Sequence, residues 1–583
     1  MLISAMAHRP ESEDCFLIDA HQVRLRFKTA LGDIQNVTAL YGDPYWNLPD
    51  KTGEYHFTYS IAPMTKIASG QTHDYWAVTL KPPYQRIQYL FAATDSEGKT
   101  VLFGDRGPRE DTEAERIEAA NYFRLPYFHE IDRTKTPAWV SETVWYQIFP
   151  ERFANGDPSL NPENCLPWQP EDHPGRDDYY GGDLQGVLDH LDDLQGLGVN
   201  GLYFCPIFKA SSNHKYDTVD YLEIDPAFGD KALFAKLVHE AHARGMRVML
   251  DAVFNHMGYA SMQWQDVLQN GQKSRFVDWF HIHDWPLLPY RDPTQGQGDP
   301  QFDTFAFGPG MPKLNTANPE VQDYLLEIAT YWVKQFDIDA WRLDVANEVD
   351  HHFWRQFHDA LIAIKPDFYI LGEVWHSSQP WLNGDEFSGV MNYAFTQQIE
   401  DHFLTGVSDA NTMLARLSDQ LMLYRDNVNA MMLNMLDSHD TPRLLTVAGG
   451  DLDRALQALA FTFLQTGTPC IYYGTEMGMA GENDPDDRKP MDWTKLHQST
   501  WQRVHALVAL RREFARLLGQ GTTSYALSDT GLIKVTRQLA DQTLEGYFNT
   551  TNQPVAINAT PRLQQGYQAG ILAPKGFIVN AVS

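Results

Sequence analysis

The sequence predicts a closed parallel (β/α)8 barrel with an all-β domain on each side of it. Between residues 144 and 474, eight apolar strand candidates alternate with amphipathic stretches, which is typical of such a barrel. The first 120 or so residues and the last 60 or so contain short alternating stretches between Gly, Asp and Pro turns, as β-sandwiches do. The 583 residues are enough for three or four domains.

The eight strand candidates are apolar runs that end at polar or acidic positions. They are VWYQIF, VNGLYF, RVMLDAVF (247–254), DIDAWRLDV (337–345), DFYILGEVW (367–375), GVMNYAF (389–395), AMMLNMLDS (430–438) and TPCIYYG (468–474). In the helix expected after the first strand, apolar residues from Val187 to Leu197 follow a 3.6-residue period, and Gly198 supplies the stop.

These patterns divide the chain into domains. We expect an N-terminal β-sandwich over residues 1–122, a linker over 123–140, the barrel over 141–515 and a C-terminal β-sandwich over 516–583. A barrel usually takes about 250 residues, so the surplus needs a place. We assign it to an inserted subdomain at 257–320, which follows the third strand and has no clean helical or strand period.

Composition excludes several classes of partner and location. Lys and Arg total 46 against 76 Asp and Glu, so the formal charge of −30 argues against nucleic acid or an anionic membrane as partner. We see no run of about 18 apolar residues and no signal-peptide pattern at the N-terminus, so we expect a cytoplasmic protein. The four cysteines lie far apart in the sequence, which makes structural disulfides unexpected.

Two carboxylates follow consecutive strands of the predicted barrel. The interval between Asp344 and Glu373 is the length of one β-α-β step, so both should reach the same rim. Each residue alone could be a helix N-cap or a structural ion pair. Acids and histidines at four strand ends together favour a site, and two carboxyl groups at about 5 to 5.5 Å are the arrangement that cleaves a glycosidic bond with retention.

The neighbouring residues suggest how the two carboxylates divide the work. Arg342 and Asp344 face the same way on one strand, so the cation should keep Asp344 ionised as nucleophile. Glu373 then becomes the acid, with its pKa raised by the nearby carboxylate of Asp440. His256 is a further candidate to bind sugar hydroxyls, and so is His439.

Four sequence strings, in their order and spacing, are similar to the four sequence regions of the α-amylase superfamily. They are DAVFNH (251–256), WRLDVANE (341–348), GEVWH (372–376) and DSHD (437–440). MPKLN (311–315) and the VANE end of the second string further resemble the cyclomaltodextrinase, neopullulanase and maltogenic amylase subgroup. The resemblance covers essentially the entire chain.

The resemblance implies a role for each matching residue. It makes Asp344 the nucleophile, Glu373 the general acid/base and Asp440 the stabiliser of the transition state, in agreement with the roles argued from the residues. It also implies a set of sugar contacts at Tyr216, His256, Arg342, Trp375, His439, Asp484 and Arg488. Without the resemblance, Tyr216 could equally be a core tyrosine, Trp375 a packed loop tryptophan, and DPDDRK a solvated turn.

The resemblance also implies a calcium site near the first strand, with one departure. The matching positions are Asn155, Asp157, Asn161, Gly181 and Asp183. Leu160 stands where a further oxygen ligand is expected, and calcium takes six to eight oxygens, so the site should be weakened. Such an ion would be structural, since cleavage by two carboxylates requires no cofactor.

The implied function is a retaining hydrolase of α-1,4 glucosidic bonds, with α-1,6 bonds as a further candidate, in cyclomaltodextrins, pullulan and maltooligosaccharides. Transglycosylation is expected beside hydrolysis because Trp375 resembles the aromatic residue that receives an acceptor sugar. The subgroup's N-terminal domain resembles a starch-binding module and mediates a homodimer, which we expect here too.

Three other functions stay open on the sequence. One is an α-glucosidase on short oligosaccharides, and another is a non-catalytic sugar-binding relative, which the presence of Asp344 and Glu373 disfavours. The third is a metal-dependent hydrolase built on His281 and His283, which is disfavoured because this pair falls in the insertion.

Overall fold

The computed structural model describes residues 1–49, 51–287 and 289–582, and the chain divides into two compact units. The first contains the N-terminal residues and the second contains the barrel. The first unit comprises Met1–Lys135, Ser408–Asn429 and Ser524–Leu527, and the second comprises Thr136–Val407, Ala430–Thr523 and the residues from Ser528 onward.

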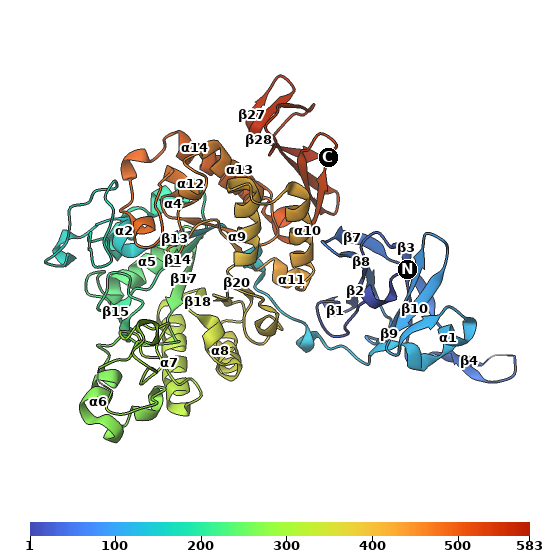
Figure 1. Ribbon diagram of the computed structural model, residues 1–583, viewed down its shortest axis with the longest axis horizontal. Coiled ribbons are helices and arrows are strands. Elements are labelled where there is room, and N and C mark those ends of the chain that lie inside the picture. The colour runs from blue at the N-terminus through green and yellow to red at the C-terminus, as the bar shows by residue number, and fades with distance from the viewer. Residues whose placement is uncertain (50, 288, 583) are drawn as a thin grey trace. The chain divides into compact units, whose positions relative to one another are not determined.

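Eight parallel strands form the predicted barrel. In sheet order they are β20 (Gly389–Val390), β19 (Tyr369–Gly372), β18 (Ala340–Leu343), β17 (Arg247–Ala252), β14 (Gly201–Phe204), β13 (Trp145–Ile148), β22 (Thr468–Tyr472) and β21 (Leu433–Asn434). A parallel bridge between Met391 and Leu433 joins the two end strands and closes the cylinder. Strands β13, β14, β17 and β18 lie at the centre of this unit in Figure 1, with α7 and α8 beside them. The predicted fold class is confirmed.

Helices connect the strands of the barrel or follow the last of them. They are α2 (Pro150–Phe153), α3 (Leu184–Asp189), α4 (Leu191–Leu197), α5 (Lys231–Ala243), α7 (Pro319–Phe336), α8 (His351–Ile364), α9 (Tyr393–Ile399), α12 (Leu444–Val447), α13 (Leu452–Phe463), α14 (Ser499–Glu513) and α15 (Ala515–Gln520). The predicted stop is confirmed, because α4 ends at Gly198 in the left-handed conformation that glycine tolerates best.

The sixth strand is shorter than predicted. Only Gly389–Val390 is extended, and the rest of the apolar run GVMNYAF enters α9. Tyr393, Thr396 and Ile399 are buried at helical spacing on that helix. A short apolar run does not distinguish a buried strand from a buried helix, so this part of the prediction is wrong.

Between β17 and α7 the chain forms the insertion, which is less irregular than predicted. It contains α6 (Met262–Asn270), whose Trp264 and Val267 are buried, and short 3-10 helices. The helix was missed because only a narrow apolar stripe marks it. A hairpin of β15 (Phe208–Ala210) and β16 (Thr218–Ile224) follows the second barrel strand.

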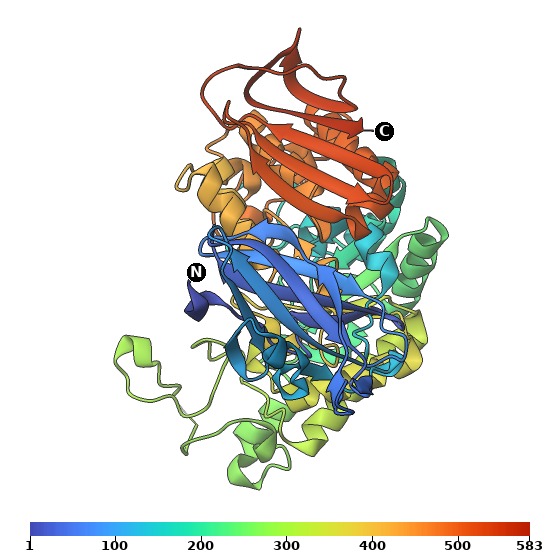
Figure 2. The same cartoon turned by 90° about the vertical axis from the view of Figure 1, so that its right-hand side faces the viewer.

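The C-terminal residues are rich in β-structure. After β23 (Thr522–Leu527), the strands are β24 (Ile533–Leu539), β25 (Gln542–Phe548), β26 (Val555–Ala556), β27 (Leu563–Gln568) and β28 (Ile571–Val582). β28 pairs with β25, β26 and β27, so these strands belong to one connected sheet. Figure 2 shows this sheet in red at the top of the view.

The N-terminal residues form two antiparallel sheets, as predicted. One sheet contains β1 (Cys15–Asp19), β2 (Gln22–Ala30), β8 (His73–Leu80) and β7 (Thr65–Ser69). The other contains β11 (Gly107–Glu110), β10 (Thr100–Gly104), β9 (Ile87–Asp95), β3 (Ile34–Gly42) and β6 (Ser60–Pro63). β4 (Asn47–Pro49) pairs with β5 (Tyr55–Phe57).

Three further features belong to this unit. β12 (Phe123–Leu125) pairs with β9, so sheet pairing continues past residue 122 into the expected linker, where Phe123 and Leu125 are buried. A short helix, α1 (Glu113–Ile117), precedes it. Helices α10 (Ala410–Leu421) and α11 (Asp426–Asn429), which lie between two barrel strands in sequence, also belong to this unit.

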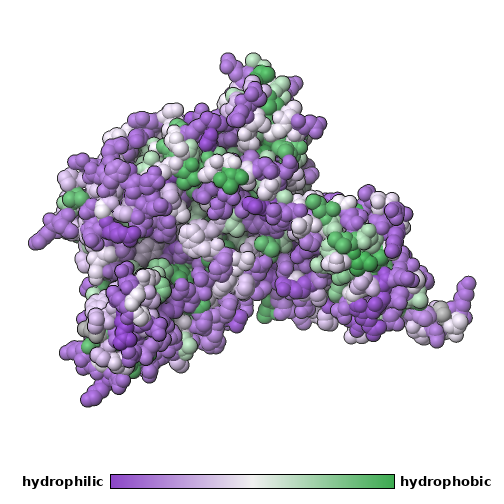
Figure 3. Space-filling model, viewed as in Figure 1, coloured by the Kyte–Doolittle hydropathy of each residue, from purple (hydrophilic) through white to green (hydrophobic). Residues whose placement is uncertain are grey.

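The face seen in Figure 3 is mostly hydrophilic, as the high content of acidic residues suggests. Among the described residues, none of the helices combines the length and apolar composition needed to cross a lipid bilayer. The four cysteines are unpaired; they are Cys15, Cys165, Cys205 and Cys470.

Candidate active site

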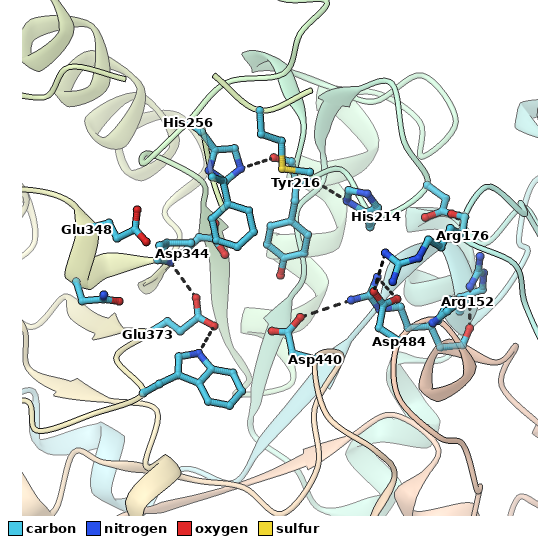
Figure 4. A pocket seen from close by; sticks show the side chains of 18 of the residues that line it. Arg152, Arg176, His214, Tyr216, His256, Asp344, Glu348, Glu373, Asp440 and Asp484 are labelled. Atoms are coloured by element: carbon cyan, nitrogen blue, oxygen red, sulfur yellow. Dashed lines mark hydrogen bonds and ion pairs between the residues drawn. The ribbon is translucent and has the colours of Figure 1, made fainter. Parts of the chain in front are cut away.

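A cavity of about 720 Å³ opens at the carboxyl ends of the barrel strands. Eight of the ten predicted site residues outside the calcium set line it, and they are Tyr216, His256, Asp344, Glu373, Trp375, Asp440, Asp484 and Arg488. In Figure 4, the carboxyl groups of Glu373 and Asp440 and the ring of Tyr216 point into the same space. The structure therefore gathers residues that are far apart in the sequence.

Strand geometry positions the two central carboxylates. Asp344 directly follows β18 and Glu373 directly follows β19, and these two strands are neighbours in the barrel. The backbone N–H of Val345 donates to Oε2 of Glu373 at 2.9 Å, and the indole N–H of Trp375 donates to Oε1 at 3.2 Å. Each oxygen of Glu373 thus has a fixed partner.

The guanidinium of Arg342 contacts three carboxyl groups of the site from its buried side. Its Nη1 donates to Oδ1 of Asp344 at 2.8 Å and to both oxygens of Asp251 at 2.9 Å, while its Nη2 lies 2.9 Å from Oε2 of Glu373. Arg342 is completely buried and does not itself line the cavity. Its position is that of a support beneath the carboxylates.

The site holds more negative charge than its one central guanidinium can neutralise. Burial raises the pKa of Asp344 well above its usual range, and Arg342 opposes this effect without cancelling it. Burial likewise raises the pKa of Asp251 to about 6 and that of Asp440 to about 7, and the neighbouring carboxylate of Glu373 adds to both shifts. We expected Arg342 to lower the pKa of Asp344, but desolvation outweighs the cation here.

Tyr216 lies between β15 and β16 and forms one wall of the cavity. Its hydroxyl donates to Oδ2 of Asp251 at 3.0 Å and also contacts Nε2 of His439. The rings of Tyr216 and His439 are parallel, with centroids 5.3 Å apart. His439, like Arg342, is fully buried behind the wall instead of facing the cavity.

His256 lines the cavity next to Tyr216. Its Nε2 donates to the backbone oxygen of Tyr216 at 3.0 Å, and burial lowers its pKa to about 3, so the ring is neutral. Phe305, from the insertion, stacks on it with ring centroids 5.2 Å apart.

The loop after β22 brings two more predicted residues to the cavity. Nη1 of Arg488 lies 2.9 Å from Oδ1 of Asp484, and Nη2 lies 3.5 Å from Oδ1 of Asp440. Nε of Arg488 also donates to the backbone oxygen of His439 at 2.8 Å. This arginine therefore fixes the loop that carries Asp440.

Trp375 is the exposed aromatic residue of the rim. Its side chain is 53% accessible, and its ring stacks on Tyr393 at 3.6 Å between centroids. An open aromatic face of this kind suits a sugar ring.

Several residues in or behind the cavity wall carry no recognisable signal in the sequence. His214, two positions before Tyr216, and Phe305, in the insertion, carry no periodic signal of their own. Asp251 stood at a strand end in the sequence, but its hydrogen bonds to Arg342 and Tyr216 depend on three separate segments meeting. Arg176, whose Nη1 lies 3.7 Å from Oδ2 of Asp484, comes from the loop after the first strand.

The expected calcium residues lie together after β13, but their oxygen atoms are partly committed. Both oxygens of Asp183 accept backbone N–H groups, from Gly156, Asp157 and Gly186. The side-chain amide of Asn155 donates to Oδ1 of Asn161 at 3.0 Å.

Two further facts concern this loop. Gly181 approaches the asparagine pair so closely that a Cβ on it would lie 2.3 Å from Oδ1 of Asn161. Oδ1 of Asn155 is buried without a hydrogen-bond partner among the described residues. The donor set therefore fits a calcium ion incompletely.

The alternative His281 and His283 pair does not form a cluster of metal ligands. His283 pairs with Asp303 at 2.7 Å. Within the part of the chain that the structure describes, no three His, Cys, Asp or Glu side chains are grouped so as to hold a metal ion.

A closed (β/α)8 barrel that brings two carboxyl groups together at consecutive strand ends is an arrangement that suits glycoside hydrolysis. Comparisons with known proteins agree. Residues 147–518 match the alpha amylase catalytic domain, and residues 1–129 match the alpha amylase N-terminal ig-like domain.

Relatives match over nearly their whole length. The chain is 49% identical to the intracellular maltogenic amylase of Bacillus subtilis, over 95% of this chain and 92% of that one. It is 42% identical to neopullulanase 2 of Thermoactinomyces vulgaris, over 96% and 92%. The solved structure of a cyclomaltodextrinase superposes with a TM-score of 0.87 at 42% identity, covering 97% of this chain and 95% of that one.

This chain belongs to the α-amylase family, and it is a glycoside hydrolase.

Proposed function

We propose that this enzyme cleaves the α-1,4 glucosidic bonds of cyclomaltodextrins, pullulan and maltooligosaccharides by double displacement with retention. The observation that carries the proposal is the Arg342 guanidinium, whose Nη1 lies 2.8 Å from Asp344 and whose Nη2 lies 2.9 Å from Glu373. One guanidinium that reaches both carboxylates holds them side by side, which supports the separation of about 5 to 5.5 Å that retention requires. The names of these relatives support the substrate class.

Two chemical steps follow from this arrangement. In the first, a carboxylate oxygen of Asp344 forms a bond to the anomeric carbon while the bridging oxygen leaves with a proton from Glu373. In the second, Glu373 takes a proton from a water molecule, which attacks the same carbon and releases Asp344. Two inversions leave the product in the α configuration. No cofactor takes part in either step.

The other cavity residues bind and distort the sugar in this proposal. Asp440 hydrogen-bonds ring hydroxyls and favours the transition state, and Tyr216 stacks beneath the sugar whose bond is cleaved. Trp375 offers its open face to an acceptor, which supports transglycosylation beside hydrolysis. Asp484 and Arg488 hold the sugar on the far side of Asp440, a role supported by their ion pair in the cavity wall.

A product profile tests the proposal. Purified enzyme is incubated with γ-cyclodextrin, pullulan, starch and maltotriose, and the first products are read by NMR, with Asp344→Asn as the inactive control. We expect turnover of γ-cyclodextrin, α anomers at first turnover, and a pH–rate curve that falls on both sides. Release of only single glucose units from chain ends, with closed cyclodextrins untouched, would favour the α-glucosidase instead. Binding without turnover would favour a non-catalytic sugar-binding protein.

We propose that calcium, if bound near β13, binds weakly and is structural. The incomplete donor set at Asn155, Asp157, Asn161, Gly181 and Asp183 supports this, together with Leu160 in place of an oxygen donor. Melting temperatures measured with calcium and with a chelator should differ by little. A large chelator-induced drop would contradict the proposal.

We also propose a cytoplasmic homodimer assembled through the N-terminal unit, which resembles a starch-binding module. Exposed apolar side chains around the β4–β5 pair support a protein-binding face, and they are Tyr45, Trp46, Leu48 and Tyr55. The word intracellular in the name of the Bacillus subtilis relative supports the location. Light scattering of the intact chain should give twice the monomer mass, and a monomeric mass at micromolar concentration would contradict the dimer.

A further inference from the structure

Gln147 is a buried polar residue with no part in the proposed chemistry. It lies on β13, the first barrel strand, and its side chain is 1% exposed. Its amide nitrogen lies 2.8 Å from Nδ1 of His439 and 3.7 Å from the sulfur of Cys205. Both N–H groups of the amide thus have an acceptor if Nδ1 of His439 carries no proton.

A chain of hydrogen bonds runs from Gln147 through His439, Tyr216 and Asp251 to Arg342. The direction of donation is fixed at its Arg342 end. Arg342 can only donate, and it donates from Nη1 to both oxygens of Asp251. Asp251 also accepts the hydroxyl proton of Tyr216 at 3.0 Å. The oxygen of Tyr216 is then left as an acceptor for His439, so the proton of the imidazole belongs on Nε2.

The surroundings of His439 keep its ring neutral. Burial lowers the pKa of His439 well below its usual value, and the cations Arg488 and Arg342 lower it further, with a smaller effect from His214. Nε2 lies 3.2 Å from Oδ2 of Asp440. The charged and titratable groups that face the ring are therefore Asp440, Arg488, Arg342, His214, Tyr216 and, through Tyr216, Asp251.

A neutral imidazole has two tautomers, and in His439 they differ in what Nε2 offers to Tyr216 and Asp440. With the proton on Nε2, His439 donates to the hydroxyl oxygen of Tyr216, and the same N–H lies beside Oδ2 of Asp440 at 3.2 Å; both residues line the cavity. With the proton on Nδ1, a bare Nε2 would face a carboxylate oxygen of Asp440 and the oxygen of Tyr216. The hydrogen bond made by one ring nitrogen decides which form is present.

We propose that Gln147 is a positioning residue that holds the proton of His439 on Nε2, so that His439 can orient Tyr216 and Asp440 toward the sugar. This inference rests on the proposed glycoside hydrolysis and adds a residue to it. Gln147 itself touches neither the cavity nor the reacting atoms. Its amide is suited to the task because it donates, whereas a carboxylate of the same shape could only accept.

Two substitutions of similar size test the proposal on full-length enzyme with γ-cyclodextrin. Gln147→Met removes the donor without a charge and should lower kcat about 10-fold, the effect of losing one hydrogen bond. Gln147→Glu places an acceptor at Nδ1 and demands a proton there, so we expect a loss of about 100-fold, as for a misplaced catalytic group. In Gln147→Glu the pKa of His439 rises, because a carboxylate now faces it, and an additional titration should appear in the pH profile.

A double-mutant cycle separates positioning from packing. If Gln147 acts through His439, Gln147→Met should add little to the loss already caused by His439→Asn. Melting temperatures identify a variant that fails to fold. If Gln147→Glu fails to fold, the cycle with Gln147→Met still tests the proposal.

Two results would overturn the inference. One is wild-type rates and pH profile in both Gln147 variants, and the other is fully additive losses in the cycle. An inactive wild-type enzyme would instead refute the proposed function, so the two failures are distinguishable.

Discussion

The two ends of β18 carry two buried aspartates with opposite surroundings. Asp339 immediately precedes the strand and Asp344 immediately follows it, and both are nearly inaccessible. Both carboxylate oxygens of Asp339 accept hydrogen bonds from several donors, among them Arg247 and Lys365. Asp344 instead shares the guanidinium of Arg342 with other carboxylates. The same four-residue strand thus separates a stabilising end from a reactive end, as is general for such barrels.

At the amino end, Asp339 is strongly stabilised in its charged form. Burial alone would raise its pKa, but hydrogen bonds from His242 and Lys365 and from the backbone N–H of Val248 bring it below the usual range. Nη1 of Arg247 donates to it at 2.8 Å as well.

At the carboxyl end, burial raises the pKa of the aspartate more than its ion pair lowers it. The pKa of Asp344 is raised, and the neighbouring charges of Glu373 and Asp251 raise it further against the effect of Arg342. A carboxylate that is poorly satisfied before substrate binds has more to gain from bonding to an anomeric carbon. The contrast teaches that burial does not by itself predict whether an acid is structural or reactive; the ratio of donors to carboxylates does.

The largest effect should come from exchanging the reactive acid. Asp344→Asn should lower kcat/KM on γ-cyclodextrin by about 10³-fold or more, because the nucleophile is lost. Asp339→Asn, the matched change at the other end, should leave kcat/KM nearly unchanged in the folded protein. Equal losses in the two variants would contradict the distinction between a stabilising end and a reactive end of β18.

Thermal stability should reverse this order. Asp339→Asn leaves buried donors without their charged partner, so we expect a loss of about 3 kcal/mol and a lower melting temperature. Asp344→Asn removes a crowded negative charge and should raise the melting temperature. Scanning calorimetry of both variants checks this, and a destabilised Asp344→Asn would contradict it.

The pH dependence of these stability differences should be opposite. The lowered pKa of Asp339 means that its stabilisation is complete above the unfolded pKa of about 4 and is lost as pH falls toward the folded value. The raised pKa of Asp344 means that its destabilisation is absent below the unfolded pKa of about 4, grows as pH rises toward the folded value and is complete above it. Melting curves of wild type and both variants between pH 3 and 8 would reveal parallel trends if this account were wrong.

The smallest effect concerns one donor at the stabilising end. Nζ of Lys365 lies 2.8 Å from Oδ1 of Asp339, and Lys365→Met should cost about 1 kcal/mol with no change in rate. Lys334→Met, at an exposed position of α7, is the control and should be neutral. An equal effect at both lysines would remove Lys365 from the network.

Much of the fold could be predicted because its signals are local. The strand at 340–343 is apolar except for Arg342, and Gly198 marks a helix end through its own backbone freedom. The start of the helix Tyr393–Ile399 could not be separated from a strand, since residues 393–395 continue the short apolar run GVMNYAF. The hydrogen bonds to Asp339 could not be predicted from the sequence, because their donors come from three separate segments: α5, β17 and the residue that follows α8.

The site was predictable where chemistry lies at a strand end. Asp344 and Glu373 could be paired because a β-α-β step separates them, which fixes their distance in space. The burial of Arg342 and His439 behind the cavity wall could not be predicted, because it depends on where Tyr216 lies. The role of Gln147 could not be predicted either, because its contact with His439 joins two segments that are far apart in the sequence.

The most direct test of the two-carboxylate mechanism is to trap the intermediate. An activated fluorosugar of the α-glucosyl series, whose ring fluorine slows breakdown of a covalent glycosyl-enzyme, is incubated with the enzyme, which is then digested and analysed by mass spectrometry. We predict one added sugar on the peptide that contains Asp344, and none in Asp344→Asn. A sugar attached to Glu373 or Asp440, or steady turnover with no covalent adduct, would contradict the account.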